Sequence, residues 1–236
     1  MSEEIFREDA YAKSCDSVVT GIMEEGIILD RTVFYPEGGG QPGDTGVLCR
    51  QDGSTVLIAD TRKAPDGNGI IHVIAAGTAP LSVGEAVTVE LDWDRRYAHM
   101  RMHTCLHLLC SLIEGGVTGG SIGETKGRLD FDLPNTALDK GQITCDLNDL
   151  IALGKPTSIS WITDEEMAAR EDLVRTMSVK PPMGQGQVRL MEVSGIDLQP
   201  CGGTHVLSTA EIGRVRIGKI ENKGKHNRRI NVLFDE

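Results

Sequence analysis

The chain contains 236 residues, including six cysteines, and carries a formal net charge of −11. This length allows one large domain or two modest ones, each with a real hydrophobic core. No apolar run approaches the length of a membrane span, and the charged start fits neither a secretory signal nor a basic transit peptide. The acidic balance argues against tight non-specific binding to nucleic acid, and scattered cysteines without a disulfide framework indicate a cytoplasmic protein.

The first ninety or so residues predict β structure. Short runs rich in Val and Ile alternate with Gly, Pro and Asp, a pattern typical of strands joined by turns. These runs cover residues 26–36, 46–51, 54–63, 69–75 and 85–93. Several short strands at this spacing favour a small barrel, so we expect a β-barrel domain at residues 1–92.

A long helix follows, from Arg95 to about Glu114, with Asp94 as the expected N-cap and Gly115-Gly116 as its end. Its apolar residues recur on one face at helical spacing: Met102, Leu106, Leu109 and Ile113.

Beyond the helix, the pattern is mixed. Strand-like runs at 117–123, 128–133, 158–163, 188–193, 214–221 and 229–234 surround a charged helical stretch at 164–177. Pro181-Pro182 and the glycines after it predict a loop. We therefore expect an α+β second domain at residues 93–236.

Two pairs of metal-ligand side chains stand out in the second domain. His103 and His107 occupy positions i and i+4 of the predicted helix, so they share one face. Cys201 and His205 flank a Gly-Gly turn, where a tight loop can bring a thiolate and an imidazole together. Three nitrogens and one sulfur suit a tetrahedral zinc site. The pairs lie more than ninety residues apart, so the fold must bring them together.

The spacing leaves other interpretations open. A His pair on a helix is more often packing or surface than a metal site, and Cys201 alone fits a buried small hydrophobic position. His99 stands one helical turn before His103, so it is a rival ligand or a residue beside the site. Thr104 takes the place of the general-base Glu of zincins. A zinc ion here could therefore activate water, orient a substrate or hold the structure.

Five sequence blocks resemble one known family. HTCLHLL at 103–109 and CGGTHV at 201–206 resemble the two metal-binding motifs of the alanyl-tRNA synthetase editing domain and of its free-standing relatives, the AlaX trans-editing proteins. YPEGGGQPGDTG at 35–46 resembles the glycine-rich motif of the AlaX-M type, and GGSIGETKGRLDFDL at 119–133 and IENKGKHNRRI at 220–230 follow in the family's order. Cys105 departs from the pattern, where a small residue such as Ala is expected.

The resemblance implies an N-terminal β-barrel followed by an α+β zinc-binding editing domain, like the second additional domain of threonyl- and alanyl-tRNA synthetases. It implies one Zn²⁺ held by His103, His107, Cys201 and His205. It also implies hydrolysis of the ester that joins a wrong amino acid, serine or glycine, to alanine tRNA. A synthetase pocket for alanine rejects serine poorly because serine only adds a hydroxyl, so a second site that hydrogen-bonds this hydroxyl discriminates better.

The resemblance also assigns residues to the editing site. Thr118 aligns with the polar residue beside the substrate, and Gln41 and Asp44 are the polar members of the glycine-rich motif, so these three are the expected catalytic residues. The expected substrate-binding residues are Gly38, Gly39, Gly40, Lys126, Arg128, Gly202, Gly203, Arg228 and Arg229. On composition alone, the glycines at 38–40 fit a tight turn between strands, and Lys126 and Arg128 fit solvated surface.

Basic residues crowd the C-terminal segment of this acidic chain: Arg214, Arg216, Lys219, Lys223, Lys225, Arg228 and Arg229. Such a patch can meet backbone phosphates while the acidic remainder repels random polyanions. His72 and His226 are expected to be solvated.

The leading hypothesis is a zinc-dependent deacylase that acts on alanine tRNA charged with the wrong amino acid. Neither DNA nor a membrane is an expected partner, and a monomer is favoured. One alternative is a hydrolase of another aminoacyl ester on the same scaffold. The other is a non-catalytic tRNA-binding module stabilised by a structural zinc ion.

Overall fold

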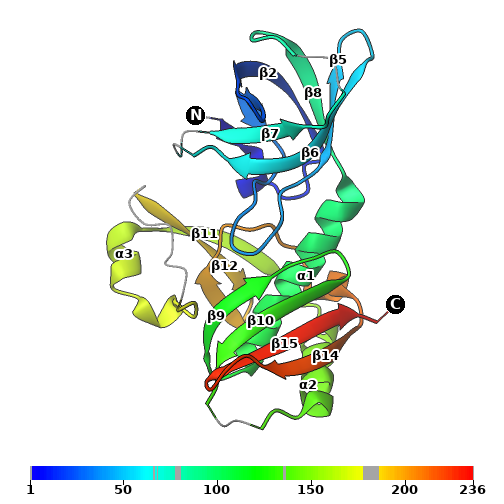
Figure 1. Ribbon diagram of the computed structural model, residues 1–236. Coiled ribbons are helices and arrows are strands. Elements are labelled where there is room, and N and C mark those ends of the chain that lie inside the picture. The colour runs from blue at the N-terminus through cyan, green and yellow to red at the C-terminus, as the bar shows by residue number, and fades with distance from the viewer. Residues whose placement is uncertain are drawn as a thin grey trace. The chain divides into compact units, whose positions relative to one another are not determined.

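The computed structural model describes residues 2–65, 67, 69–77, 81–134, 137–177 and 186–235, so the loop predicted at Pro181-Pro182 lies outside the described residues. The chain forms two compact units, Met1–Tyr97 and Ala98–Glu236. Helix α1 (Trp93–Leu112) begins in the first unit and continues into the second. In Figure 1 the first unit is blue to cyan-green and the second runs from green to red.

The N-terminal unit contains a closed β-barrel with strand order β2-β3-β7-β6-β5-β8, in which neighbours pair antiparallel (Figure 1). Its strands are β2 (Ser14–Ile22), β3 (Gly26–Leu29), β5 (Gly46–Arg50), β6 (Thr55–Lys63), β7 (Ile70–Ile74) and β8 (Ala86–Leu91). Successive side chains of a strand alternate between the two faces, so Val56 and Ile58 enter the barrel core while Leu57 faces solvent. The predicted barrel is confirmed.

Two short strands and a helical turn complete the first unit: β1 (Glu3–Glu4), β4 (Arg31–Thr32) and η1 (Ile5–Arg7). β1 and β4 pair in parallel. Strand β2 is absent from the sequence prediction because its outward residues, such as Asp16 and Thr20, dilute the Val and Ile signal that marks the other strands.

The glycine-rich motif forms a tight turn. Gly38 and Gln41 exchange backbone hydrogen bonds of 3.1 and 2.9 Å, and between them Gly39 and Gly40 have φ values of +59° and +83°. Two consecutive positive φ angles are the requirement of a two-residue I′ hairpin turn, and glycine meets it without strain. Gly43 has a different reason, since a Cβ there would lie 2.1 Å from the carbonyl oxygen of Thr61. These glycines therefore allow the backbone turn and the close packing of strands in the first unit.

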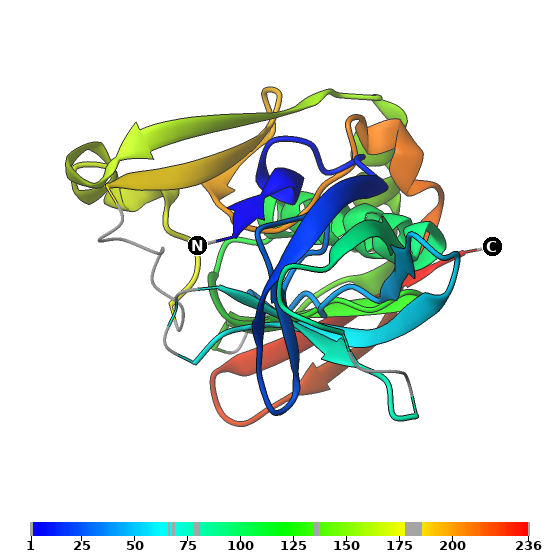
Figure 2. The ribbon, with the colours of Figure 1, turned by 90° about the horizontal axis from the view of Figure 1, so that it is seen from above.

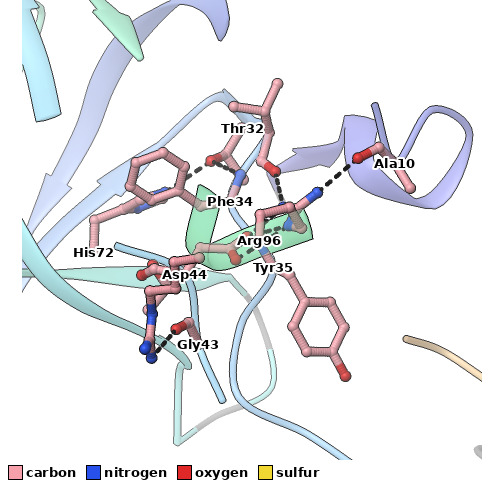
Figure 3. Close-up of polar contacts among 11 residues, drawn as sticks. Ala10, Thr32, Phe34, Tyr35, Gly43, Asp44, His72 and Arg96 are labelled. Carbon is pink, nitrogen blue, oxygen red and sulfur yellow. Dashed lines mark hydrogen bonds and ion pairs between the residues drawn. The ribbon is translucent and has the colours of Figure 1, made fainter. Parts of the chain in front are cut away.

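A fully buried ion pair between Asp44 and Arg96 lies next to this turn (Figure 3). Arg96 Nε donates to Asp44 Oδ2 at 2.9 Å, and Nη2 contacts the same carboxylate. Arg96 also donates to the carbonyl oxygens of Val33 at 2.6 Å and Ala10 at 3.1 Å, while Asp44 accepts the N–H of Tyr35 at 2.6 Å. The pair joins the N-terminal arm, the glycine-rich motif and the first turn of α1.

His72 is buried in the barrel, so the expectation that it is solvated is wrong. Its Nδ1 faces the carbonyl oxygen of Ile27 at 3.4 Å, which places the proton on Nδ1 and leaves Nε2 to accept from Thr32 Oγ1 at 2.9 Å. Burial lowers the pKa of His72 to about 4, so the ring is neutral at pH 7. His226 is exposed, as expected.

The C-terminal unit contains two antiparallel sheets. The four-stranded sheet has the order β14-β15-β10-β9 and consists of β9 (Gly116–Ser121), β10 (Lys126–Asp132), β14 (Val215–Asn222) and β15 (Asn227–Phe234). The three-stranded sheet has the order β11-β12-β13 and consists of β11 (Thr157–Thr163), β12 (Gln187–Val193) and β13 (Asp197–Pro200). Figure 2 shows β11 and β12 as a long ribbon with the short helix α3 (Asp164–Ala168) at one end.

Helix α1 starts two residues before the predicted position. Asp92, rather than Asp94, accepts the N–H of Arg95 with its carboxylate at 3.2 Å, so the cap lies earlier in the chain. The apolar face that the sequence predicts is buried, at 5% exposure or less: Met102, Leu106, Leu109 and Ile113. Gly127 of β10 lets the sheet approach this face, because a Cβ there would lie 2.7 Å from the Met102 side chain.

Two other helices differ from the prediction. Helix α2 (Lys140–Ala152) is missing from it, although Ile143, Leu147 and Ile151 recur at helical spacing and Asp139 caps the N-terminus. The charged stretch at 164–177 is helical only in α3 and in the 3₁₀ turn η2 (Glu171–Leu173). Backbone hydrogen bonds of 2.8 Å from Val117 to Arg175 and from Met177 to Val117 draw its end alongside β9 instead. Among the described residues, no helix is long and apolar enough to cross a membrane.

Candidate metal centre and editing site

Four side chains of the C-terminal unit converge: His103 and His107 from α1, and Cys201 and His205 from the loop after β13. Their potential ligand atoms all lie within 4.8 Å of one another. The three histidines are at most 8% exposed, and Cys201 is half-buried. The structure thus brings together the four residues that the sequence pairs, and His99, although buried on the same helix, is not in this group.

The spacing of the donors fits a tetrahedral zinc ion. Zinc bonds of about 2.3 Å to sulfur and about 2.0–2.1 Å to nitrogen, at tetrahedral angles, put sulfur and nitrogen ligands about 3.5 Å apart. Cys201 Sγ lies 3.5 Å from His103 Nε2 and 3.3 Å from His205 Nε2. The chemistry of the four donors and the two separations from Cys201 Sγ therefore suit a zinc ion.

Asp197, the first residue of β13, orients His107. Its Oδ2 accepts from His107 Nδ1 at 2.9 Å and from Gln199 Nε2 at 2.7 Å, and its side chain is fully buried. With the proton held on Nδ1, Nε2 of His107 is the nitrogen left for the metal cluster. Burial lowers the pKa of His107, but the hydrogen bonds to Asp197 and Cys201 outweigh burial and raise it to about 9. A more basic imidazole is also a stronger metal ligand.

Thr104 orients His205. The Thr104 hydroxyl donates to the carbonyl oxygen of Met100 at 3.0 Å, so its oxygen accepts from His205 Nδ1 at 3.2 Å and from the N–H of Val206 at 3.3 Å. This arrangement leaves Nε2 of His205 facing Cys201 Sγ. Thr104, at the position of the zincin Glu, is thus a fixed anchor for the ligand loop.

The loop that carries Cys201 and His205 is held by the buried Arg189 of β12. Arg189 Nη1 donates to the carbonyl oxygens of Cys201 at 2.8 Å and Gly203 at 3.0 Å, and the Cys201 N–H donates back to the Arg189 carbonyl at 3.1 Å. The N–H of Gly203 lies 3.5 Å from Cys201 Sγ. Gly203 is therefore part of the scaffold of the loop, and Gly202 beside it is half-buried.

The two thiols near the cluster differ in reactivity. Burial raises the pKa of Cys201, but the imidazoles of His103 and His205 hold it well below its usual value, which favours the thiolate that metals bind. Cys105 is fully buried in α1, and burial raises its pKa to about 12. The unexpected cysteine is therefore an inert packing residue.

The other predicted site residues of the C-terminal unit lie on its four-stranded sheet. Thr118 Oγ1 of β9 lies 3.1 Å from both the Asp130 carbonyl oxygen and Asn227 Oδ1. Arg229 makes a bidentate ion pair with Asp130, each bond 2.8 Å long, and Arg128 contacts the same carboxylate at 2.7 Å. Lys126 is exposed, and Arg228 is half-buried.

The predicted residues of the glycine-rich motif belong to the N-terminal unit. Gly38, Gly39, Gly40 and Gln41 form the tight turn, and Gln41 is fully buried. Asp44 is 1% exposed and bound to Arg96.

Sequence reasoning missed the residues that orient the ligands: Asp197, Gln199, Arg189 and the hydroxyl function of Thr104. No spacing signal marks them, because they come from different elements and meet the ligands only through the fold.

Family comparisons identify the class of protein. The family model for tRNA synthetases class II (A) matches residues 4–95, and the model for the threonyl and alanyl tRNA synthetase second additional domain matches residues 188–231. The chain therefore combines a module of class II synthetases with the additional domain that threonyl- and alanyl-tRNA synthetases share.

Relatives define the family more closely. The alanyl-tRNA editing protein AlaX-M of Methanosarcina barkeri is 39% identical, and that of Methanosarcina mazei is 36% identical; each comparison covers 98% of this chain and at least 95% of the relative. The alanine–tRNA ligase of Pyrobaculum aerophilum is 34% identical over 93% of this chain but only 25% of the ligase. The chain belongs to the AlaX-M family of alanyl-tRNA editing proteins.

Proposed function

We propose that this chain is a trans-editing hydrolase that cleaves the aminoacyl ester of alanine tRNA charged with serine and, more weakly, with glycine. The observation that carries the proposal is the buried cluster of three imidazoles and one thiol in a chain that matches named alanyl-tRNA editing proteins from end to end. An editing site separate from synthesis is needed because a pocket for alanine excludes serine poorly.

We assign one zinc ion to His103, His107, Cys201 and His205. When bound, it would supply a fixed positive charge that holds the four donors together. Four protein donors complete a tetrahedral shell, which is the arrangement of structural zinc sites. The four ligands would therefore fix the 201–205 loop against α1, while Arg189 and Thr104 hold the same loop through its backbone and His205.

We assign discrimination of the serine hydroxyl to Thr118, the half-buried hydroxyl of β9 that follows the metal helix. Its two neighbouring acceptors, 3.1 Å away, support a hydroxyl whose position is fixed before substrate binds. Asp44 we assign instead to the fold of the barrel, because its carboxylate is buried and bound to Arg96.

Metal analysis and a panel of charged tRNAs test the proposal. Purified protein should contain about one zinc per chain, and the double variant His103→Ala, Cys201→Ala should lose it, whereas His99→Ala should retain it. Hydrolysis of serine-charged alanine tRNA should exceed that of correctly charged alanine, serine and threonine tRNAs. Faster hydrolysis of another ester would favour the other hydrolase, and tRNA binding with no hydrolysis would favour the non-catalytic module.

A further inference from the structure

A basic hollow of about 510 Å³ lies on the C-terminal unit, and none of the residues assigned above to metal binding or to serine recognition lines it. Strands β10, β14 and β15 and the first residue of α2 line it. Its lining residues are Lys126, Lys140, Arg216, Gly218, Lys219, Asn231 and Leu233, which include four cations and no acid.

The hollow opens on the face of the sheet that is turned away from α1. Gly127 faces α1, because a Cβ there would meet Met102, and adjacent residues of a strand point to opposite faces. Lys126 therefore points away from the helix that carries the two histidines. Leu233 pairs with Lys126 on one side and with Arg216 on the other, so the three residues form one row across three strands.

A bulge in β14 creates the floor. The register of β14 with β15 shifts between Ile217 and Ile220, and Gly218 lies in this irregularity. A Cβ at Gly218 would lie 2.4 Å from the Leu233 side chain, so any other residue would fill or distort the hollow. Asn231 Nδ2 donates to the Lys219 carbonyl oxygen at 2.6 Å, and this hydrogen bond holds the bulge in place.

The positive charge of the rim is only partly neutralised. Arg216 lies 3.5 Å from Asp235, but Asp235 also contacts Arg214 at 3.6 Å. Lys219 lies 3.3 Å from Glu221, which also contacts Lys223 at 3.7 Å.

Within the described ranges, Lys126 and Lys140 make no ion pair. By contrast, Arg128 and Arg229, which the family resemblance assigns to substrate binding together with Lys126, share the carboxylate of Asp130. Lys126 and Lys140 therefore leave two uncompensated positive charges at the hollow.

We propose that this hollow binds the sugar-phosphate backbone of the RNA substrate, on a stretch away from the esterified end. The proposal rests on the proposed function, which supplies RNA as the partner. In a chain with a net charge of −11, a local group of cations gives a polyanion one favoured place to bind. The lining has no aromatic side chain on which a base could stack, so its contacts suit phosphates, which position an RNA, rather than bases.

The test is the affinity of the full-length protein for uncharged alanine tRNA over a range of salt concentrations. The double variant Lys126→Glu, Lys140→Glu should raise Kd by about tenfold or more at low salt, and the slope of log K against log salt should shrink by about two. The matched comparison is Lys223→Glu, Lys225→Glu, which makes the same change in charge on the turn between β14 and β15, the part of the basic C-terminal segment that does not line the hollow. The control should change Kd by less than about threefold.

Unchanged affinity and salt slope in the hollow variant would overturn the proposal. Equal weakening in the control would also overturn it, because the effect would then follow net charge rather than the hollow. Uncharged tRNA carries no ester, so this result is independent of catalysis. Wild-type protein that binds tRNA through the hollow but hydrolyses no charged tRNA would refute the proposed function and leave this inference standing.

Discussion

Replacement of Asp197 by Asn should weaken zinc binding without unfolding the C-terminal unit. The Asp197 carboxylate is fully buried and accepts the Nδ1 proton of His107 at 2.9 Å. Asn keeps the size of the side chain but removes the charge that holds this proton in place. His107 then presents Nε2 to the cluster less often and as a weaker base.

The magnitude follows from this one hydrogen bond. A hydrogen bond to a charged group contributes about 1.5–3 kcal/mol, and each factor of ten in affinity corresponds to about 1.4 kcal/mol. Zinc affinity should therefore fall about ten- to a hundredfold, which is also the usual effect of losing such a partner, with Asp197→Asn at the lower end because Asn keeps an acceptor oxygen for Nδ1. Asp197→Ala should lie at the upper end, because it leaves the Nδ1 donor of His107 buried without a partner.

Competition with a chromophoric chelator measures the affinity directly. The matched control is Glu192→Gln, which removes one acidic charge from an exposed position on the neighbouring strand β12. Circular dichroism should show the same secondary structure in all variants. Zinc affinities of both Asp197 variants within about threefold of the wild type would refute the reasoning that Asp197 positions His107.

Three further predictions concern single residues. Thr118→Val removes the hydroxyl proposed to recognise serine, so hydrolysis of serine-charged alanine tRNA should fall about ten- to a hundredfold. Any weak hydrolysis of the correctly charged tRNA should change less, and an unchanged ratio of the two rates would rule out this role for Thr118. Asp44→Asn leaves the buried Arg96 charge uncompensated, so denaturant unfolding should show a loss of about 3–5 kcal/mol, and a loss below about 1 kcal/mol would contradict the ion-pair account. The folded pKa of His72, about 4, lies below its ordinary 6.5, so the unfolded chain binds this proton first as the pH falls. Its stabilising contribution is complete above about pH 6.5 and falls by up to about 3 kcal/mol toward pH 4. His72→Gln should therefore flatten the profile of unfolding free energy against pH, and an unchanged profile would contradict this assignment.

The sequence predicts the features whose signals are local or periodic. The barrel follows from short Val- and Ile-rich runs, and the buried face of α1 follows from the spacing of Met102, Leu106, Leu109 and Ile113. The convergence of the His pair with Cys201 and His205 follows from ligand chemistry, because the two pairs can bind one metal ion only if the fold brings them together. Helix α2 also had a readable signal, in Asp139 and the apolar residues after it.

Features that depend on tertiary contacts could not be predicted in the same way. The pairing of Arg229 with Asp130 depends on the register of β15 with β10, and this register turns a predicted phosphate contact into an internal ion pair. The burial of His72 depends on closure of the barrel around it. Asp197 and Arg189 can hydrogen-bond to His107 and to the ligand loop only because β12 and β13 pack beside these segments.

The most direct test of the central claim compares the hydrolysis rates of one alanine tRNA carrying either serine or alanine, using zinc-loaded protein. The account predicts rapid loss of the seryl ester, slow loss of the alanyl ester, and loss of the seryl activity in the His103→Ala, Cys201→Ala variant, which lacks two of the four donors. Equal rates for the two esters, or full seryl activity in that variant, would contradict the account.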